Sequence, residues 1–235
     1  MALPKLESPK YDMTVPSTGQ EIKYRPFLVR EEKILLLAME EGTENASHNA
    51  VLDLVNSCTF GNIGNVTDPM FDVEYAFIKI RSKSVSETIN VRLLCPDDEE
   101  TYVDKSIDVD DIQIMMDEDH STHVNLSDTL SIDLTYPTIN TTLKSLNINS
   151  ETERVFFIIK SCIHTIHFGE DIYSIIDISK KELDEFVDSL TQKMFEKLQK
   201  FFNTMPKLRH TIEVENPVTG IVSEVTLEGL GDFLN

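Results

Sequence analysis

The chain has no tryptophan and few of the residues that mark long loops or disulfide frameworks. Its 235 residues include 8 glycines, 9 prolines and 3 cysteines, while 40% are hydrophobic. This composition predicts folded protein throughout, with one substantial core or two small ones. Cys58, Cys95 and Cys162 are far apart and odd in number, which argues against a disulfide framework and predicts buried free thiols in a reducing compartment.

Positive charge is also scarce. The chain has 21 basic and 41 acidic residues, which gives a net charge of -20. This charge repels phosphate backbones and anionic lipid, so we expect no nucleic-acid binding and no membrane-surface binding, and a basic or polar protein partner fits better. No apolar run approaches the roughly 20 residues of a membrane span, and Met1–Lys5 lacks the apolar core of a secretory signal. We therefore expect the protein in the cytosol where it is made.

Motifs of the common enzyme classes are missing. The sequence has no Gly-x-x-x-x-Gly-Lys-Ser/Thr, Gly-x-Gly-x-x-Gly, Gly-x-Ser-x-Gly or His-Glu-x-x-His pattern, so nucleotide, acyl-transfer and metalloprotease chemistry have no local support. Cys58 falls at an apolar position of a predicted helix, which favours packing over a role as nucleophile. We expect no enzymatic activity, no catalytic residue and no cofactor.

Histidine and cysteine cluster twice along the chain. Cys162, His164 and His167 form one group, and His120 and His123 form the other. Zinc needs three or four convergent ligands, whereas His164 and His167 are three apart on a predicted strand and point to opposite faces. We predict ordinary packed or solvated histidines and no metal site.

An acidic segment spans residues 97–119. It contains no glycine, which excludes an EF-hand loop, and it offers no apolar pocket that would raise a carboxyl pKa for acid–base catalysis. We interpret it as a solvated acidic edge that opposes strand aggregation and can meet a basic partner.

The patterning predicts an α+β fold with three zones. Residues 1–83 form an N-terminal arm and helices, residues 84–137 form an acidic antiparallel β insert with period-two alternation, and residues 138–235 form a helical region with a terminal β-hairpin. The mainly helical core joins the first and third zones in one compact unit, with short hairpins near both termini. Apolar spacing predicts a helix through Val51–Cys58 and one long helical pattern from Leu183 to Phe202 that Pro206 ends.

Further start and turn signals mark single elements. Asp68-Pro69 predicts a helix start, and capping-box spacing predicts helices after Ser150 and Ser179. Gly169–Asp171 predicts a hairpin turn between two short strands.

Three groups of short segments follow one another along the chain. The N-terminal group is Met1–Pro4, Val15–Gly19 and Tyr24-Arg25-Pro26-Phe27 through Glu31-Glu32-Lys33. The central group is Phe71–Glu87 with Cys95 and Tyr136–Thr138, and the C-terminal group is Glu185-Phe186, Phe201–Leu208 and Leu227–Leu234. In this order and spacing, the segments resemble the T4-type phage baseplate hub family. The chain departs from the expected pattern at Ser86, where glycine is expected, and at Phe233-Leu234, where two aromatics are expected.

The resemblance implies a role in building the hub of the contractile tail tip, as an assembly factor or as a hub component. It implies protein–protein binding to other baseplate hub and tail proteins, in the host bacterial cytoplasm during assembly or in the virion baseplate, and it leaves a homo-oligomer open. Partner contacts are expected at the arm and at the apolar C-terminal elements: Tyr24, Arg25, Phe27, Arg30, Phe201, Phe202, Leu230 and Phe233. Deletion of residues 1–25 is then expected to abolish hub recruitment and to leave the helical core folded. An acidic metal-dependent enzyme and an acidic host-directed inhibitor stay open as alternatives.

Overall fold

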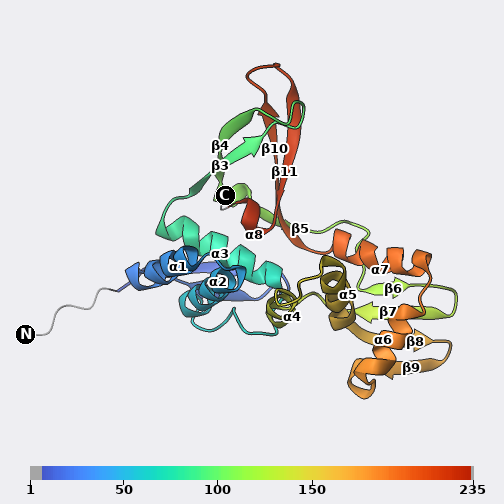
Figure 1. The fold of residues 1–235 in the computed structure, drawn as a ribbon. Coiled ribbons are helices and arrows are strands. Elements are labelled where there is room, and N and C mark those ends of the chain that lie inside the picture. The colour runs from blue at the N-terminus through green and yellow to red at the C-terminus, as the bar shows by residue number, and fades with distance from the viewer. Residues whose placement is uncertain (1–6, 234–235) are drawn as a thin grey trace, which may run out of the picture. The chain divides into compact units, whose positions relative to one another are not determined.

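The chain folds as two units with separate cores (Figure 1). The structure is a computed structural model that describes residues 7–233. Unit 1 comprises residues 1–115 and 207–235, and unit 2 comprises residues 116–206. The predicted α+β class is confirmed, because helices alternate with four small antiparallel sheets in the described chain. The first boundary between the units falls between residues 115 and 116, inside the predicted β insert of residues 84–137. The strands predicted for this insert therefore contribute to both units.

Helix α3 (Met70–Ser84) lies at the centre of unit 1. It is apolar around most of its circumference and contacts α2 (Glu44–Cys58), α8 (Gly229–Asp232) and β10 (Lys207–Glu215). The helix begins one residue later than the Asp68-Pro69 signal predicts: Pro69 is the N-cap, and Asp68 accepts hydrogen bonds from the preceding loop instead. In α2, the predicted apolar face is confirmed, because its four residues are all buried: Val51, Leu54, Val55 and Cys58.

The N-terminal arm is a hairpin of β1 (Tyr11–Thr14) and β2 (Glu21–Tyr24). Its turn reverses at Gly19, whose φ of +68° is in the left-handed region that glycine tolerates. Met13 and Tyr24 are buried, and the carboxylate of Asp72 on α3 accepts hydrogen bonds from both the backbone N–H and the hydroxyl of Ser17.

The hairpin is therefore part of the core of unit 1. The expectation that residues 1–25 can be removed without loss of folding does not fit this packing. Deletion would expose the apolar surface that the hairpin covers and leave the carboxylate of Asp72, which is 2% exposed, without its hydrogen-bond donors.

A buried ion pair joins the end of β2 to α1 (Val29–Glu41) and α2. Arg25 Nη2 lies 2.9 Å from Glu31 Oε1 and 2.9 Å from Ser57 Oγ. Arg30 Nε lies 2.6 Å from the same Glu31 oxygen, while Glu31 Oε2 accepts a 2.8 Å hydrogen bond from the backbone N–H of Leu28. Burial alone would raise the pKa of Glu31, but these donors outweigh it and lower that pKa to about 2.

Two long hairpins complete unit 1. They are β3 (Thr88–Leu94) with β4 (Tyr102–Asp108), and β10 with β11 (Val222–Glu228), and they lie side by side (Figure 1). After β4, the short helix η1 (Val109–Asp111) leads to β5 (Gln113–Met115), which pairs with β10. The inward residues of both hairpins share one core with Ile78 of α3: among them are Val91, Ile107, Leu208, Val214 and Leu227.

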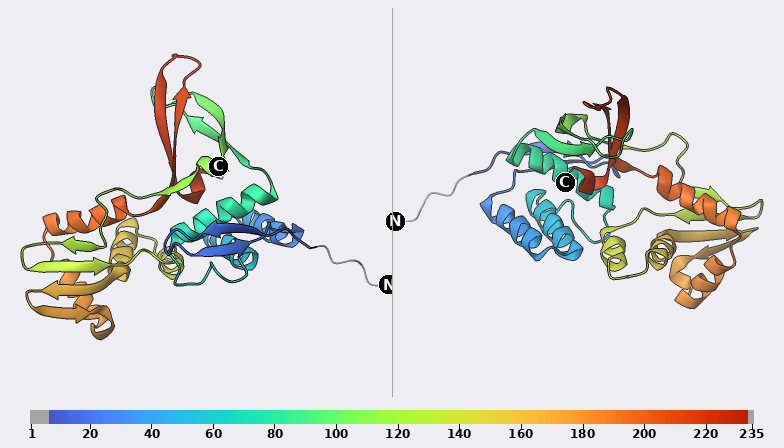
Figure 2. Two further views of the ribbon diagram at one scale, coloured as in Figure 1. Left: turned by 180° about the vertical axis from the view of Figure 1, so that it is seen from behind. Right: turned by 45° about the horizontal axis from the view of Figure 1, so that its top comes forward.

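Unit 2 is an antiparallel sheet with helices on one face (Figure 2). The strand order is β6 (His123–Asn125), β7 (Leu130–Leu134), β8 (Ile163–Phe168) and β9 (Asp171–Ser174). Ile132 and Ile166 point from the sheet into a core that includes Ile159 of α5 (Glu151–Cys162). The β8–β9 hairpin and the Ser150 N-cap of α5 are as predicted, and α4 (Ile139–Ser145) precedes α5.

The long helical pattern predicted from Leu183 to Phe202 is wrong as one helix. It forms α6 (Lys180–Asp188) and α7 (Gln192–Thr204), after the 3-10 helix η2 (Ile175–Asp177). The break follows from local hydrogen bonding: the Ser189 hydroxyl donates to the backbone carbonyl of Phe186, and the Thr191 side chain caps the first turn of α7. The capping box of Ser179 and Glu182 is confirmed at the start of α6.

None of the described helices is both long and apolar enough to cross a membrane.

The low pKa of Glu31 predicts a specific loss of stability in acid. A carboxyl group whose pKa is lowered in the folded state stabilises fully above its unfolded pKa, and this stabilisation is lost as the pH falls toward the folded value. Lowering the pKa from 4.5 to about 2 corresponds to about 3 kcal/mol. We expect the unfolding free energy of Glu31→Gln to be lower than wild type near neutral pH and to fall less between pH 5 and pH 2, as measured by urea unfolding.

The matched control is Glu32→Gln, which changes an exposed carboxylate in the same helical turn. It should keep the wild-type pH dependence. An E31Q protein with the wild-type slope would show that the buried pair does not govern this acid sensitivity.

Candidate functional site

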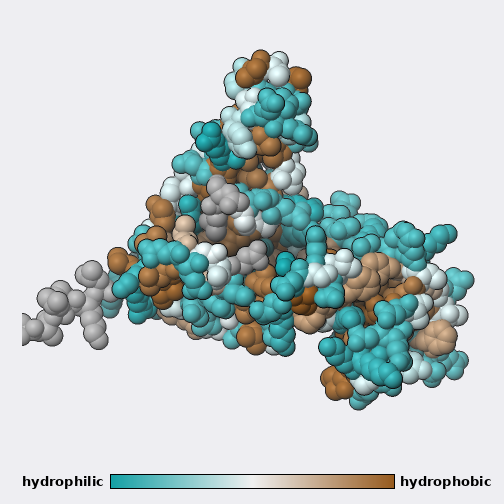
Figure 3. Space-filling model, viewed as in Figure 1, coloured by the Kyte–Doolittle hydropathy of each residue, from teal (hydrophilic) through white to brown (hydrophobic). Residues whose placement is uncertain are grey.

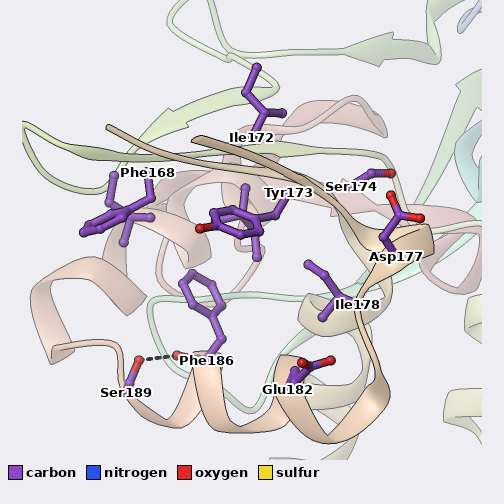
Figure 4. A pocket seen from close by; sticks show the side chains of 11 residues that line it. Phe168, Ile172, Tyr173, Ser174, Asp177, Ile178, Glu182, Phe186 and Ser189 are labelled. Carbon is purple, nitrogen blue, oxygen red and sulfur yellow. Dashed lines mark hydrogen bonds between the residues drawn. The ribbon is translucent and has the colours of Figure 1, made fainter. Parts of the chain in front are cut away.

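An apolar groove opens between the outer strand of the unit 2 sheet and α6. We call it the β9 groove, and its cavity volume is about 620 Å³. In Figure 4 the rings of Phe168, Tyr173 and Phe186 and the side chain of Ile178 lie close together in the groove. Its full lining is Leu130, Ile166, Phe168, Ile172, Tyr173, Ser174, Asp177, Ile178, Glu182, Phe186 and Ser189.

The groove borders an open sheet edge. Strand β9 pairs with β8 on one side and, within residues 7–233, has no strand on the other side. Ile172 is 69% exposed and Phe168 is 55% exposed, so apolar side chains accompany the unpaired backbone groups of the edge. An exposed apolar edge is a template for strand addition. Natural proteins cover such an edge or place charged residues on it, unless the edge serves to bind a partner.

Polar groups lie at the rim of the groove. Asp177 and Glu182 contribute carboxyl groups, and Ser189 contributes a hydroxyl (Figure 4). The carboxylate of Glu182 already accepts a hydrogen bond from the backbone N–H of Ser179, which fixes it at the start of α6. An apolar floor with acidic groups at the rim suits a peptide segment with apolar side chains and basic flanks.

A second apolar surface lies on α1 in unit 1. We call it the α1 face, and it comprises Val29, Ile34, Leu36, Leu37 and Met39, of which Val29 is 80% exposed and Met39 is 72% exposed. Figure 3 shows brown, hydrophobic side chains gathered over this helix. On α1 the only buried residues that the structure describes are Glu31 and Ala38. The helix therefore presents most of its apolar surface to solvent, as interaction surfaces do.

The predicted partner residues of the N-terminal region differ in accessibility. Tyr24 and Arg25 are buried, so they cannot meet a partner in this structure: Tyr24 lies in β2 with its ring against that of Tyr11, and Arg25 is held by Glu31. Phe27 is half-buried, and Arg30 is exposed beside the α1 face.

The predicted C-terminal residues divide in the same way. Phe201 and Phe233 are buried in the cores of unit 2 and unit 1, which removes them from any surface role. Phe202 and Leu230 are half-buried, and the backbone N–H of Leu230 donates to Glu74 on α3 at 3.4 Å. Leu234, also part of the predicted apolar tail, lies outside the described residues. The β9 groove and α1 face were not predicted, although the apolar runs Ile34–Met39 and Ile172–Ile176 were the available signals.

The acidic segment has structural uses. The amide Nδ2 of buried Asn216 lies 3.0 Å from both carboxylate oxygens of Asp97 and 2.9 Å from Asp98 Oδ2, which joins the tips of the two long hairpins. Hydrogen bonds from Thr101, from Asn216 and from nearby backbone hold the pKa of Asp98 well below its usual value. Asp110 pairs with Lys79 at 2.7 Å. This part of the segment thus closes turns and pairs with lysine.

The structure also separates the predicted histidine and cysteine groups. His120 packs beside Phe201, with its ring nitrogens 2.9 Å from Thr204 Oγ1 and 3.2 Å from the Tyr136 hydroxyl. Cys162 is fully buried, and His164 is exposed at an irregularity in the β7–β8 pairing. His123 and His167, one from each group, instead lie together at Asp133.

All three cysteines are free and buried, as predicted. Burial raises the pKa of Cys58 to about 11 and that of Cys162 to about 12, and it also raises the pKa of Cys95. Thiols of this kind are poor nucleophiles because little thiolate forms near neutral pH.

These surfaces define an α+β protein with exposed apolar surfaces of the kind that mark protein–protein contact. The chain matches the family model described as T4 bacteriophage base plate protein over residues 8–235, and it belongs to this family. Comparison with curated proteins and with solved structures gave no match.

Burial of the thiols predicts slow modification of the native protein. Ellman's reagent at mildly alkaline pH should react with all 3 cysteines only after denaturation in guanidinium chloride. Immediate reaction of one thiol in the native protein would contradict the burial described here, and alkylation followed by mass spectrometry would identify which cysteine had reacted.

Proposed function

We propose that this phage baseplate protein acts in assembling the hub of the contractile tail tip by binding other baseplate proteins. The role contains no enzymatic step. The observation that carries the proposal is the β9 groove with its open apolar edge, because membership of the base plate family makes another tail protein the natural occupant.

The occupant that fits best is an extended segment of a neighbouring baseplate protein. Such a segment would add a strand to β9 through backbone hydrogen bonds and place alternate side chains in the groove. Phe168, Tyr173 and Phe186 supply the large, rigid apolar surfaces that dominate binding energy in interfaces.

The charge of the chain supports a basic partner. A net charge of -20 steers a positively charged segment toward the protein and disfavours association between copies of the chain. Asp177 and Glu182 at the groove rim would place such charge next to the bound segment.

The α1 face offers a second, separate contact. Its five apolar side chains lie on one helix of unit 1, whereas the β9 groove belongs to unit 2. A protein with one apolar surface on each unit can hold two hub proteins at once.

Changing the groove should weaken partner capture without unfolding the protein. We expect the double variant Phe168→Ser/Tyr173→Ser to lose at least tenfold in capture of baseplate proteins from infected cells, because both side chains are about half exposed and their loss removes apolar contact area. Pull-down with quantitative mass spectrometry measures this loss, and circular dichroism checks the fold.

The matched control is Tyr102→Ser, which removes an aromatic side chain of similar exposure from unit 1. It should capture partners as wild type does. If the groove variant captures partners as well as wild type does, the β9 groove is not the binding site. If the purified wild-type chain forms a stable dimer and the groove variant is a monomer, the occupant of the groove is a second copy of the chain.

The protein composition of finished virions distinguishes a hub component from an assembly factor. If the protein is a hub component, purified virions contain it at a fixed ratio to other baseplate proteins; if it is an assembly factor, it is present only in precursors. Quantitative mass spectrometry of virions and of hub precursors distinguishes the two results. Absence from both particle types would contradict a role in hub assembly.

A further inference from the structure

Three side chains with metal-binding atoms meet on the solvent face of the unit 2 sheet. His123 in β6 is the cross-strand partner of Asp133 in β7, and His167 in β8 is diagonal to Asp133 because its own partner is Ser131. His123 Nδ1 and His167 Nε2 each lie 2.7 Å from a different oxygen of Asp133. The potential ligand atoms of the three residues all lie within 4.8 Å of one another.

The sheet holds these side chains in place from its other face. Along each strand, the neighbouring residues Val124, Ile132 and Ile166 pack into the core of unit 2. The backbone positions of the cluster are therefore fixed by core packing, while its side chains are 29–47% exposed. A cation can enter from solvent without opening the core.

The charges of the cluster also suit a cation. An aspartate carboxylate carries a negative charge at neutral pH. Among residues 7–233 no lysine or arginine forms an ion pair with Asp133, and its two carboxylate oxygens are hydrogen-bonded to the two imidazoles. Neutral imidazole and carboxylate are the forms in which these side chains bind metals.

We propose that His123, Asp133 and His167 bind one divalent transition-metal cation of the zinc type. Two imidazole nitrogens and one carboxylate oxygen suit zinc, cobalt and nickel, whereas magnesium and calcium prefer all-oxygen sites. Metal–ligand bonds of about 2.0–2.2 Å in tetrahedral geometry place ligand atoms about 3.3 Å apart. The 2.7 Å contact to the oxygen that binds the cation must therefore lengthen by about 0.6 Å, and the other imidazole must turn from the second oxygen toward the cation, which side-chain rotation can supply.

Binding changes the hydrogen bonding in a defined way. Each imidazole gives up its N–H···O bond to Asp133 and carries its proton on the other ring nitrogen, so that the freed nitrogen binds the cation. The remaining coordination position faces solvent, where water or a side chain of a neighbouring protein can fill it. The cation would join β6, β7 and β8 and so stabilise unit 2.

The test uses the full chain after removal of metals with EDTA. Isothermal titration with Zn²⁺ should show one cation per chain, and Co²⁺ should give the visible absorption of a site with mixed nitrogen and oxygen ligands. His123→Ala, Asp133→Asn and His167→Ala should each weaken Zn²⁺ binding at least tenfold. His164→Ala is the matched control, because it removes an exposed histidine of the same strand outside the cluster, and it should bind as wild type does.

Two measurements keep the test decisive if a variant folds poorly. In the wild-type chain, which has 6 histidines, Zn²⁺ should shift the imidazole nitrogen resonances of only His123 and His167. Zn²⁺ should also raise the melting temperature of the wild type, and Mg²⁺ at the same concentration should not. Absence of Zn²⁺ binding, equal loss in H164A, or a shift confined to other histidines would overturn the proposal.

Discussion

The buried pair of Arg25 and Glu31 is the constraint on which the N-terminal half of unit 1 depends. It joins the end of the β1–β2 hairpin to the first turn of α1, and Ser57 brings α2 into the same network. A buried ion pair contributes little net stability against an apolar alternative, but removal of one partner leaves a costly buried charge. The pair instead holds α1 in place, because Ala38 is the only apolar residue that the helix buries among those described.

This mode of attachment explains why the α1 face can remain apolar and exposed. A helix that was anchored by its own leucines would have to turn Leu36 or Leu37 toward α2. Because a polar network anchors α1 instead, those side chains stay outside, where they are exposed in the isolated chain. An exposed apolar helix face costs solubility, and the strong negative charge of the chain offsets that cost while a partner is absent.

Local signals in the sequence predicted the elements well. The spacing of Val51, Leu54, Val55 and Cys58 gave the buried face of α2, and the Ser179–Glu182 capping box gave the start of α6, because helix faces and caps involve residues within one or two turns. The break at Ser189 was missed for a related reason. Apolar residues continue at helical spacing through the break, and the hydrogen bond from Ser189 to Phe186 decides between one helix and two.

The sites depend on strand register and burial, which one sequence does not specify. Arg25 and Arg30 are close in the chain, yet one is buried against Glu31 and the other is exposed. The sequence could group His120 with His123 and His164 with His167, but the grouping in space follows the cross-strand pairing of His123 with Asp133 and the diagonal to His167. A shift of one residue in either pairing would turn one of these side chains into the core.

The sheet of unit 2 therefore has three surfaces with different chemistry. One face is closed by the core, the other carries the His123–Asp133–His167 cluster, and the β9 edge is open. The short length of β9 limits non-specific strand pairing at that edge. The strand has only 4 residues, beginning with Asp171, and so offers few backbone groups for pairing. A partner must therefore also fill the groove beside Phe186 to bind firmly, so selectivity at this edge rests on side-chain fit as well as on backbone pairing.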